Sequence, residues 1–177
     1  MSRASWRIPA VLVVMTGCGR GHPAVTASWT GADTGALVAS AVATWCPGQR
    51  LLEITAIRGD SGLSLVAYPA ASWSAGIFPL FDPLTDSTRR PSAAMAVRWV
   101  TLDQVVGYRS VGGVARLARV NGTVSGTVSG RMLRSGSVSN TLAVELHFPA
   151  VPLDSAVGSC PPDSGHVAPP PGAAGVP

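Results

Sequence analysis

The chain contains no lysine, so all 13 of its basic residues are arginines. Charged residues make up only 12% of the 177 residues, about half of the roughly 25% that is usual in soluble domains. This scarcity argues against a charge-covered helical bundle, a coiled coil and a nucleic-acid-binding domain. The sequence also lacks an apolar run near the roughly 20 residues that a membrane-spanning helix needs.

The hydrophobic, glycine and proline content of the chain favours one domain that is rich in turns. Hydrophobic residues account for 46% of the chain, which is enough to bury a core. The 20 glycines and 15 prolines favour turns over long helices. The length is too small for a TIM barrel or a two-domain enzyme.

The N-terminus has the three parts of a secretory signal peptide. Arg3 and Arg7 give a positive start, an apolar run of about eight residues follows, and small residues precede Cys18. We therefore expect residues 1–17 to be a signal peptide that is removed. Loss of its two arginines leaves a formal charge of 4 − 2 = +2.

The segment Met15-Thr16-Gly17-Cys18 resembles the lipobox of bacterial lipoproteins. The resemblance implies cleavage before Cys18 and a diacylglycerol on its sulfur, with residues 18–23 as a lipidated tether. Gly19 stands where an inner-membrane retention signal would have Asp, which favours the outer membrane. The alternative is a plain signal peptide with an incidental cysteine.

Two cysteines remain if Cys18 is acylated. Because an exported chain meets an oxidising compartment, we expect Cys46 and Cys160 to form a disulfide. The alternatives are two free thiols or metal ligands, but two cysteines without a CxxC pair or a flanking His make a poor zinc site. We therefore predict no metal and no cofactor.

Strand signals dominate residues 24–160. From Val138 to Phe148, apolar and polar residues alternate with a period of two, which is typical of a half-buried strand. Similar segments are found at 24–30, 36–46, 51–58, 63–68, 94–101, 105–110, 114–120 and 124–132, separated by turn signals. We predict an all-β antiparallel sandwich, or alternatively a small β-barrel, of about seven to nine strands. Residues 36–43 could instead form a short helix, because Ala is the best helix former.

Two segments fall outside this pattern. Residues 161–177 are rich in Pro, Gly and Ala, which predicts a disordered or polyproline tail. Residues 69–92 are apolar but interrupted by proline, which excludes a central strand. We expect either a short edge strand at 77–81 or a long loop. The aromatic residues Trp73, Phe78 and Phe81 could cap the core or contact a ligand or partner.

One motif invites an enzymatic interpretation. Gly59-Asp60-Ser61 resembles the nucleophile block of GDSL-type esterases, and Asp163-Ser-Gly-His166 has the spacing of their second block. The resemblance implies Ser61 as the nucleophile, with His166 as its base and Asp163 orienting it. We reject it because that family has a parallel α/β fold and because His166 lies in the proline-rich tail. A hairpin turn explains residues 59–62.

No other catalytic motif is present in the sequence. We interpret His147 as a solvated residue on the polar face of its strand. The arginines are scattered, so we expect no nucleic-acid partner. The sequence therefore predicts a non-catalytic, lipid-anchored envelope protein. It would contact the membrane through Cys18 and would bind or assemble with an envelope protein or a surface polymer. The alternative function is a carrier of a small apolar ligand.

Overall fold

A computed structural model describes residues 23–86, 90–154 and 160. Within these residues every regular element is a strand, as the sequence predicted. The nine strands are β1 (Ala24–Gly31), β2 (Gly35–Cys46), β3 (Leu51–Arg58), β4 (Ser61–Tyr68), β5 (Ala75–Pro79), β6 (Ser92–Val100), β7 (Val105–Val120), β8 (Thr123–Arg134) and β9 (Thr141–Asp154).

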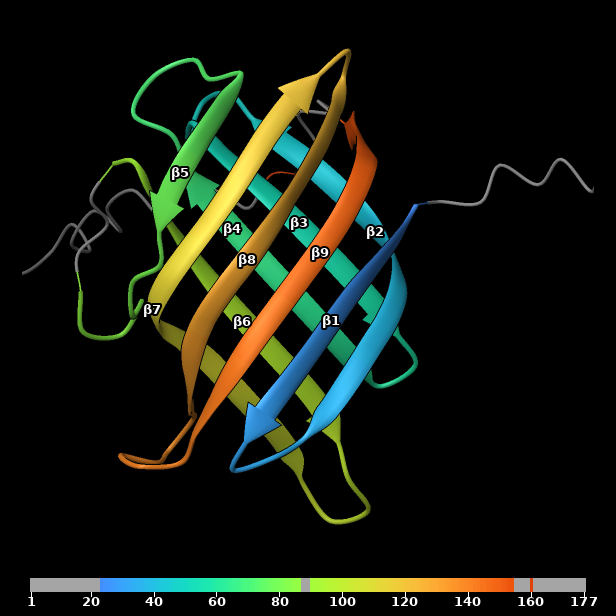
Figure 1. Ribbon diagram of the computed structural model, residues 1–177, viewed down its shortest axis with the longest axis vertical. Coiled ribbons are helices and arrows are strands. Elements are labelled where there is room, and N and C mark those ends of the chain that lie inside the picture. The colour runs from blue at the N-terminus through green and yellow to red at the C-terminus, as the bar shows by residue number, and fades with distance from the viewer. Residues whose placement is uncertain (1–22, 87–89, 155–159, 161–177) are drawn as a thin grey trace, which may run out of the picture.

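Eight of the strands close into an antiparallel barrel (Figure 1). Around the ring the order is β1, β2, β3, β4, β6, β7, β8 and β9, so the strands follow their order in the sequence with β5 left out. β1 closes the ring by pairing with β9, as Trp29 does with Val144. β5 is an additional short strand on the edge of β7. Of the two architectures that the sequence left open, the chain adopts the small barrel.

The barrel interior holds one continuous hydrophobic cluster. Alternate residues of each strand point inward, so the buried positions follow the period of two. In β9, Leu142, Val144, Leu146 and Phe148 are all buried, as the alternation predicted. Pairing of β1 with β9 closes the ring of eight strands. The outward residues include exposed apolar side chains such as Val42 and Ile57.

Three local expectations need correction. Residues 36–43 are strand rather than helix, because β2 pairs with β1 as far as Ser40 and with β3 from Ala41 onward. Gly112 and Gly113 do not end a strand; they lie inside the 16-residue β7, directly after a register shift between Ser110 and Gly112. β9 begins at Thr141, and Val138 lies in the preceding loop with 97% of its surface exposed.

The barrel has two ends, which we name by what they carry. The hairpin end carries the turns β1–β2, β3–β4, β6–β7 and β8–β9 and is the lower end in Figure 1. The terminal end carries the start of β1, the end of β9 and the turns β2–β3 and β7–β8. The chain therefore enters and leaves the barrel at the same end.

Candidate functional site

At the hairpin end, a stack of three aromatic rings crosses the barrel. The rings of Trp29 and Trp99 lie 5.2 Å apart between centroids and within 15° of parallel. Trp99 stacks in turn on Tyr108 at 5.4 Å and 16°. β1 and β6 are four strands apart in the ring of eight, so the contact between Trp29 and Trp99 spans the lumen. A Cβ atom on Gly35 would lie 2.8 Å from the indole of Trp29, so glycine is required beneath the stack.

The Tyr108 hydroxyl donates a hydrogen bond to the Asp33 carboxylate in the β1–β2 turn. Tyr108 itself is 2% exposed. Burial, followed by the hydrogen bond to Asp33, raises the pKa of Tyr108 to about 12. This pair could not be predicted from the sequence, because the two residues are 75 positions apart and meet only when β1 and β7 lie in one closed ring.

Arg90 binds the main chain near the terminal end. Its guanidinium donates to the carbonyl oxygens of Arg50, Pro69 and Gln49 at 2.7, 2.9 and 2.7 Å. It also lies over the ring of Tyr68, 5.7 Å from the centroid. Since these contacts tie the β2–β3 turn to the segment after β4, Arg90 acts as a structural clamp rather than as part of a free basic surface.

The aromatic residues singled out from the sequence are placed against the core. Phe78 is 2% exposed, and Trp73 meets its ring edge-on with 5.6 Å between centroids. Phe81 packs at a tilt against Tyr68, with centroids 6.1 Å apart. Phe78 belongs to the hydrophobic cluster and Trp73 packs on it. The arrangement is that of a core cap, and any contact of Trp73 or Phe81 with a ligand stays a prediction.

Two polar contacts hold the long segment after β5 against β7. The Arg109 Nε atom lies 2.8 Å from Oδ1 of Asp82, and the two side chains are 16% and 10% exposed. The Ser110 hydroxyl donates to the Phe81 carbonyl at 2.7 Å and accepts from the Met95 N–H at 3.0 Å. Ser110 is completely buried, so its hydroxyl takes the place of a main-chain partner where β7 bends away from β6.

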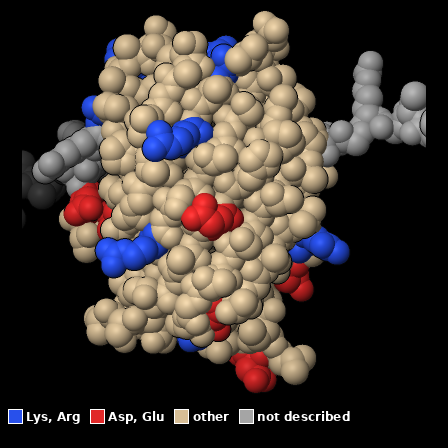
Figure 2. Space-filling model, in the orientation of Figure 1, with Lys and Arg blue, Asp and Glu red and all other residues tan. Residues whose placement is uncertain are grey.

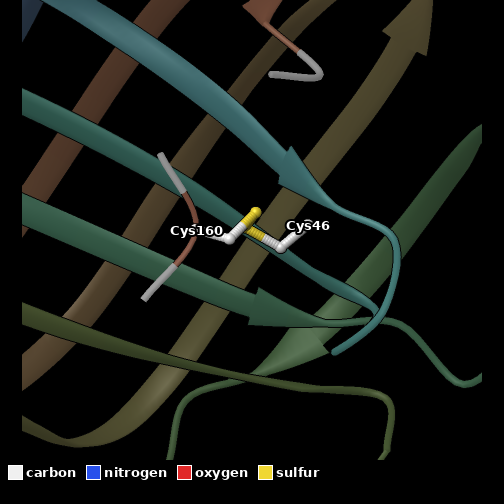
Figure 3. The surroundings of a disulfide bond; sticks show 2 residues. All are labelled: Cys46 and Cys160. Atoms are coloured by element: carbon white, nitrogen blue, oxygen red, sulfur yellow. A yellow bond between two sulfur atoms is a disulfide. The ribbon is translucent and has the colours of Figure 1, made fainter. Parts of the chain in front are cut away.

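Cys46 and Cys160 form a disulfide, as the cysteine count predicted (Figure 3). Their Cα atoms are 5.6 Å apart, and the bond closes a separation of 114 residues. Cys46 ends β2 and is 1% exposed. The disulfide therefore fixes Cys160, which lies beyond the last strand, to the terminal end of the barrel. Cys18 lies outside the described residues.

The rejected esterase residues are not assembled by the described structure. Ser61 begins β4, directly after the Gly59–Asp60 turn that the sequence predicted. Asp163 and His166 lie outside the described residues. Ser61 therefore occupies a hairpin position at the end of the barrel opposite to Cys160.

The outer face of the barrel carries few charges, and Figure 2 shows widely spaced Arg, Asp and Glu side chains on the side formed by β7, β8, β9 and β1. Glu145 and His147 are two positions apart and both face outward from β9. They line a hollow of about 430 Å³ together with Thr26 and Val38. The Ser129 hydroxyl donates to the Glu145 carboxylate at 2.6 Å. This arrangement offers hydroxyl groups and one carboxylate to a polar partner.

Within the residues described, no group of three or more His, Cys, Asp or Glu side chains is placed to hold a metal ion. In the same part of the chain, no helix is long and apolar enough to cross a membrane.

Comparisons with known proteins return no relative. No protein-family model matches the chain, and neither a curated protein nor a solved structure shows a significant match.

Proposed function

We propose that this chain is a lipid-anchored protein of the bacterial cell envelope that serves as a non-catalytic binding or assembly module. The observation that carries the proposal is the division of its three cysteines. Cys46 and Cys160 pair with each other, which suits an exported protein. Cys18 is left over, and it is the cysteine that ends the lipobox-like segment.

The short stretch of chain between Cys18 and β1 supports tethering at a membrane. Six residue steps (24 − 18) separate Cys18 from the first residue of β1. A fully extended chain of that length spans about 20 Å. Acylation of Cys18 would therefore hold the terminal end of the barrel close to the lipid headgroups, and the hairpin end would be displayed away from them. Two acyl chains give durable anchoring, since each buried CH₂ contributes about 0.8 kcal/mol.

Several polar side chains are engaged in contacts within the barrel, which supports a non-catalytic role. Asp82 is paired with Arg109, Asp33 accepts from Tyr108, and Arg90 is engaged with main-chain carbonyls. These groups stabilise the barrel. The stack of Trp29 on Trp99 crosses the lumen at the hairpin end, which favours a contact role over the alternative of an apolar-ligand carrier.

Labelling with a clickable fatty-acid analogue tests the anchor. The full chain, expressed in a bacterium with lipoprotein processing, should take up the label and fractionate with membranes. Cys18→Ser should abolish both, whereas the double variant Cys46→Ala/Cys160→Ala should still be acylated. Labelling that survives Cys18→Ser, or a wild-type chain that is never labelled, would overturn the lipid-anchor part of the proposal.

Crosslinking in the native envelope tests the binding role. The acylated chain should yield a discrete crosslinked product, with crosslinked residues on the outer face or the hairpin end of the barrel. A chain that is acylated and folded but gives no crosslinked product would contradict a binding or assembly function without affecting the anchor.

A further inference from the structure

The three stacked aromatic rings at the hairpin end connect the rim of the barrel with its interior. Trp99 is half-buried, whereas Trp29 and Tyr108 are 7% and 2% exposed. The Trp99 ring lies between the other two, with its centroid 5.2 Å from that of Trp29 and 5.4 Å from that of Tyr108. Trp99 is therefore the ring of the stack that is most accessible to solvent, and it contacts both buried rings.

The contact between Trp99 and Tyr108 joins the two side-chain types that lose a single electron most readily. Their planes lie within 16° of parallel, so the two π systems face each other without a solvent molecule or an aliphatic side chain between them. At neutral pH the tyrosyl radical is more stable than the tryptophanyl radical. Tyrosine reaches that state only if its hydroxyl proton leaves with the electron, because the phenol radical cation is a strong acid. Transfer of an electron from Tyr108 to an oxidised Trp99 therefore needs a proton acceptor beside the Tyr108 hydroxyl.

Asp33 supplies this acceptor. The Tyr108 hydroxyl donates its hydrogen bond to the Asp33 carboxylate, which is a base and forms a charge-assisted bond. Burial, followed by this hydrogen bond, raises the pKa of Tyr108 to about 12, so the hydroxyl keeps its proton at neutral pH until the ring is oxidised. Tyr68 is the only other tyrosine of the chain. Its ring contacts Phe81 and the Arg90 guanidinium, so it provides an internal comparison outside the stack.

We propose that the stack is a one-electron relay, in which Tyr108 reduces an oxidised Trp99 and passes its proton to Asp33. The oxidant is a diffusible one-electron oxidant, such as a peroxyl radical, that removes an electron from Trp99 at the rim. One electron then moves from Tyr108 to the Trp99 radical cation, and the proton on Tyr108 Oη moves to Oδ2 of Asp33. The products are neutral Trp99, a neutral tyrosyl radical and a protonated Asp33 carboxyl, so atoms and charge balance. The Cys46–Cys160 disulfide suits an oxidising compartment, where such oxidants occur.

Pulse radiolysis of the full chain with azide radicals tests the relay. Azide radicals oxidise accessible tryptophan in preference to a buried tyrosine, and the tryptophanyl and tyrosyl radicals absorb at different wavelengths. In the wild type, the tyrosyl signal should grow as the tryptophanyl signal decays, at a rate that does not depend on the protein concentration. Tyr108→Phe should remove most of the tyrosyl signal. The matched control Tyr68→Phe, which also removes one tyrosine hydroxyl, should retain it.

Two further variants distinguish a relay from a purely structural stack. Asp33→Asn keeps a hydrogen-bond acceptor beside Tyr108 but replaces the base with an amide, so the transfer should slow about tenfold or more. Trp99→Phe keeps a stacked ring that azide radicals do not oxidise, and it should slow formation of the Tyr108 radical to a similar degree. A wild type without a tyrosyl signal overturns the proposal. So does a tyrosyl signal that persists in Tyr108→Phe and vanishes in Tyr68→Phe, or a transfer rate that Asp33→Asn and Trp99→Phe both leave unchanged.

Discussion

Arg109 and Asp82 form an ion pair between β7 and the segment that follows β5, with 2.8 Å between Nε and Oδ1. The same carboxylate oxygen accepts the Leu84 N–H at 3.0 Å. The hydrogen bond from Arg109, partly opposed by burial, holds the pKa of Asp82 below its usual range. The pair fixes a proline-rich segment whose conformation the hydrophobic pattern did not determine.

The ion pair makes stability depend on pH in the acidic range. Because the folded-state pKa of Asp82 is lowered, its contribution is present above the unfolded-state pKa near 3.8 and is lost as the pH falls through the folded-state value. Asp82→Asn should cost about 2 kcal/mol near neutral pH, between the values for exposed and buried pairs. It should also flatten the acid limb of a plot of unfolding free energy against pH.

Asp103→Asn is the control, since Asp103 is exposed in the β6–β7 turn. It should change the unfolding free energy by less than about 0.5 kcal/mol. Equal losses in the two variants, measured by urea denaturation, would show that the ion pair does not stabilise the fold.

The disulfide should stabilise the barrel strongly because it closes a separation of 114 residues. Replacing Cys46 and Cys160 together with Ala should lower the free energy of unfolding by about 2 to 4 kcal/mol. Thermal unfolding with and without a reductant measures the same effect in the wild type. Cys18→Ala should retain the full response to the reductant; if it loses that response, the pairing of the cysteines is wrong.

Tyr108 should resist ionisation. The chain has two tyrosines, and burial raises the pKa of both, that of Tyr108 to about 12. The protonated Tyr108 hydroxyl therefore contributes fully to the free energy of unfolding below the unfolded-state pKa near 10. This contribution is lost as the pH rises through about 12. Tyr108→Phe keeps the stacking on Trp99 and removes the hydrogen bond to Asp33, so it should cost about 1 to 2 kcal/mol near neutral pH.

An alkaline titration followed by tyrosinate absorbance checks this pKa. The wild-type signal should rise mainly above pH 10, and Tyr108→Phe should remove the component of highest pKa. A component near pH 10 that disappears in Tyr108→Phe would mean that Tyr108 is exposed, contrary to its position in the stack.

The strand pattern was accessible from sequence because each strand buries one face. Positions such as Val144 and Leu146 alternate with polar residues, and a period of two indicates a half-buried strand whether the sheet is open or closed. Barrel and sandwich therefore could not be separated. The choice depends on pairing between β1 and β9, which are more than 100 residues apart in the chain.

The contacts of the candidate site were less accessible for the same reason. Asp33 meets Tyr108, and Trp29 meets Trp99, only because closure brings distant strands to one end of the lumen. The disulfide was predictable because cysteine chemistry and an exported chain left one pair. The expectation of a strand end at Gly112 and Gly113 was wrong, because adjacent glycines are typical of turns, whereas here they continue β7 after a bulge.

Two adjacent glycines, which follow the bulge in β7, allow a matched test of how closely β7 approaches β8. Gly113 has a φ of +127°, and a Cβ atom there would lie 2.4 Å from the Gly130 Cα atom and from the Ser129 carbonyl oxygen. Gly113→Ala should therefore cost about 2 kcal/mol or more, from backbone strain and overpacking together. A Cβ atom on Gly112 would have nothing within 4 Å. Gly112→Ala should leave stability within about 0.5 kcal/mol of the wild type. Chemical denaturation of the two variants side by side measures the difference, and equal stabilities would show that β7 does not approach β8 this closely at Gly113.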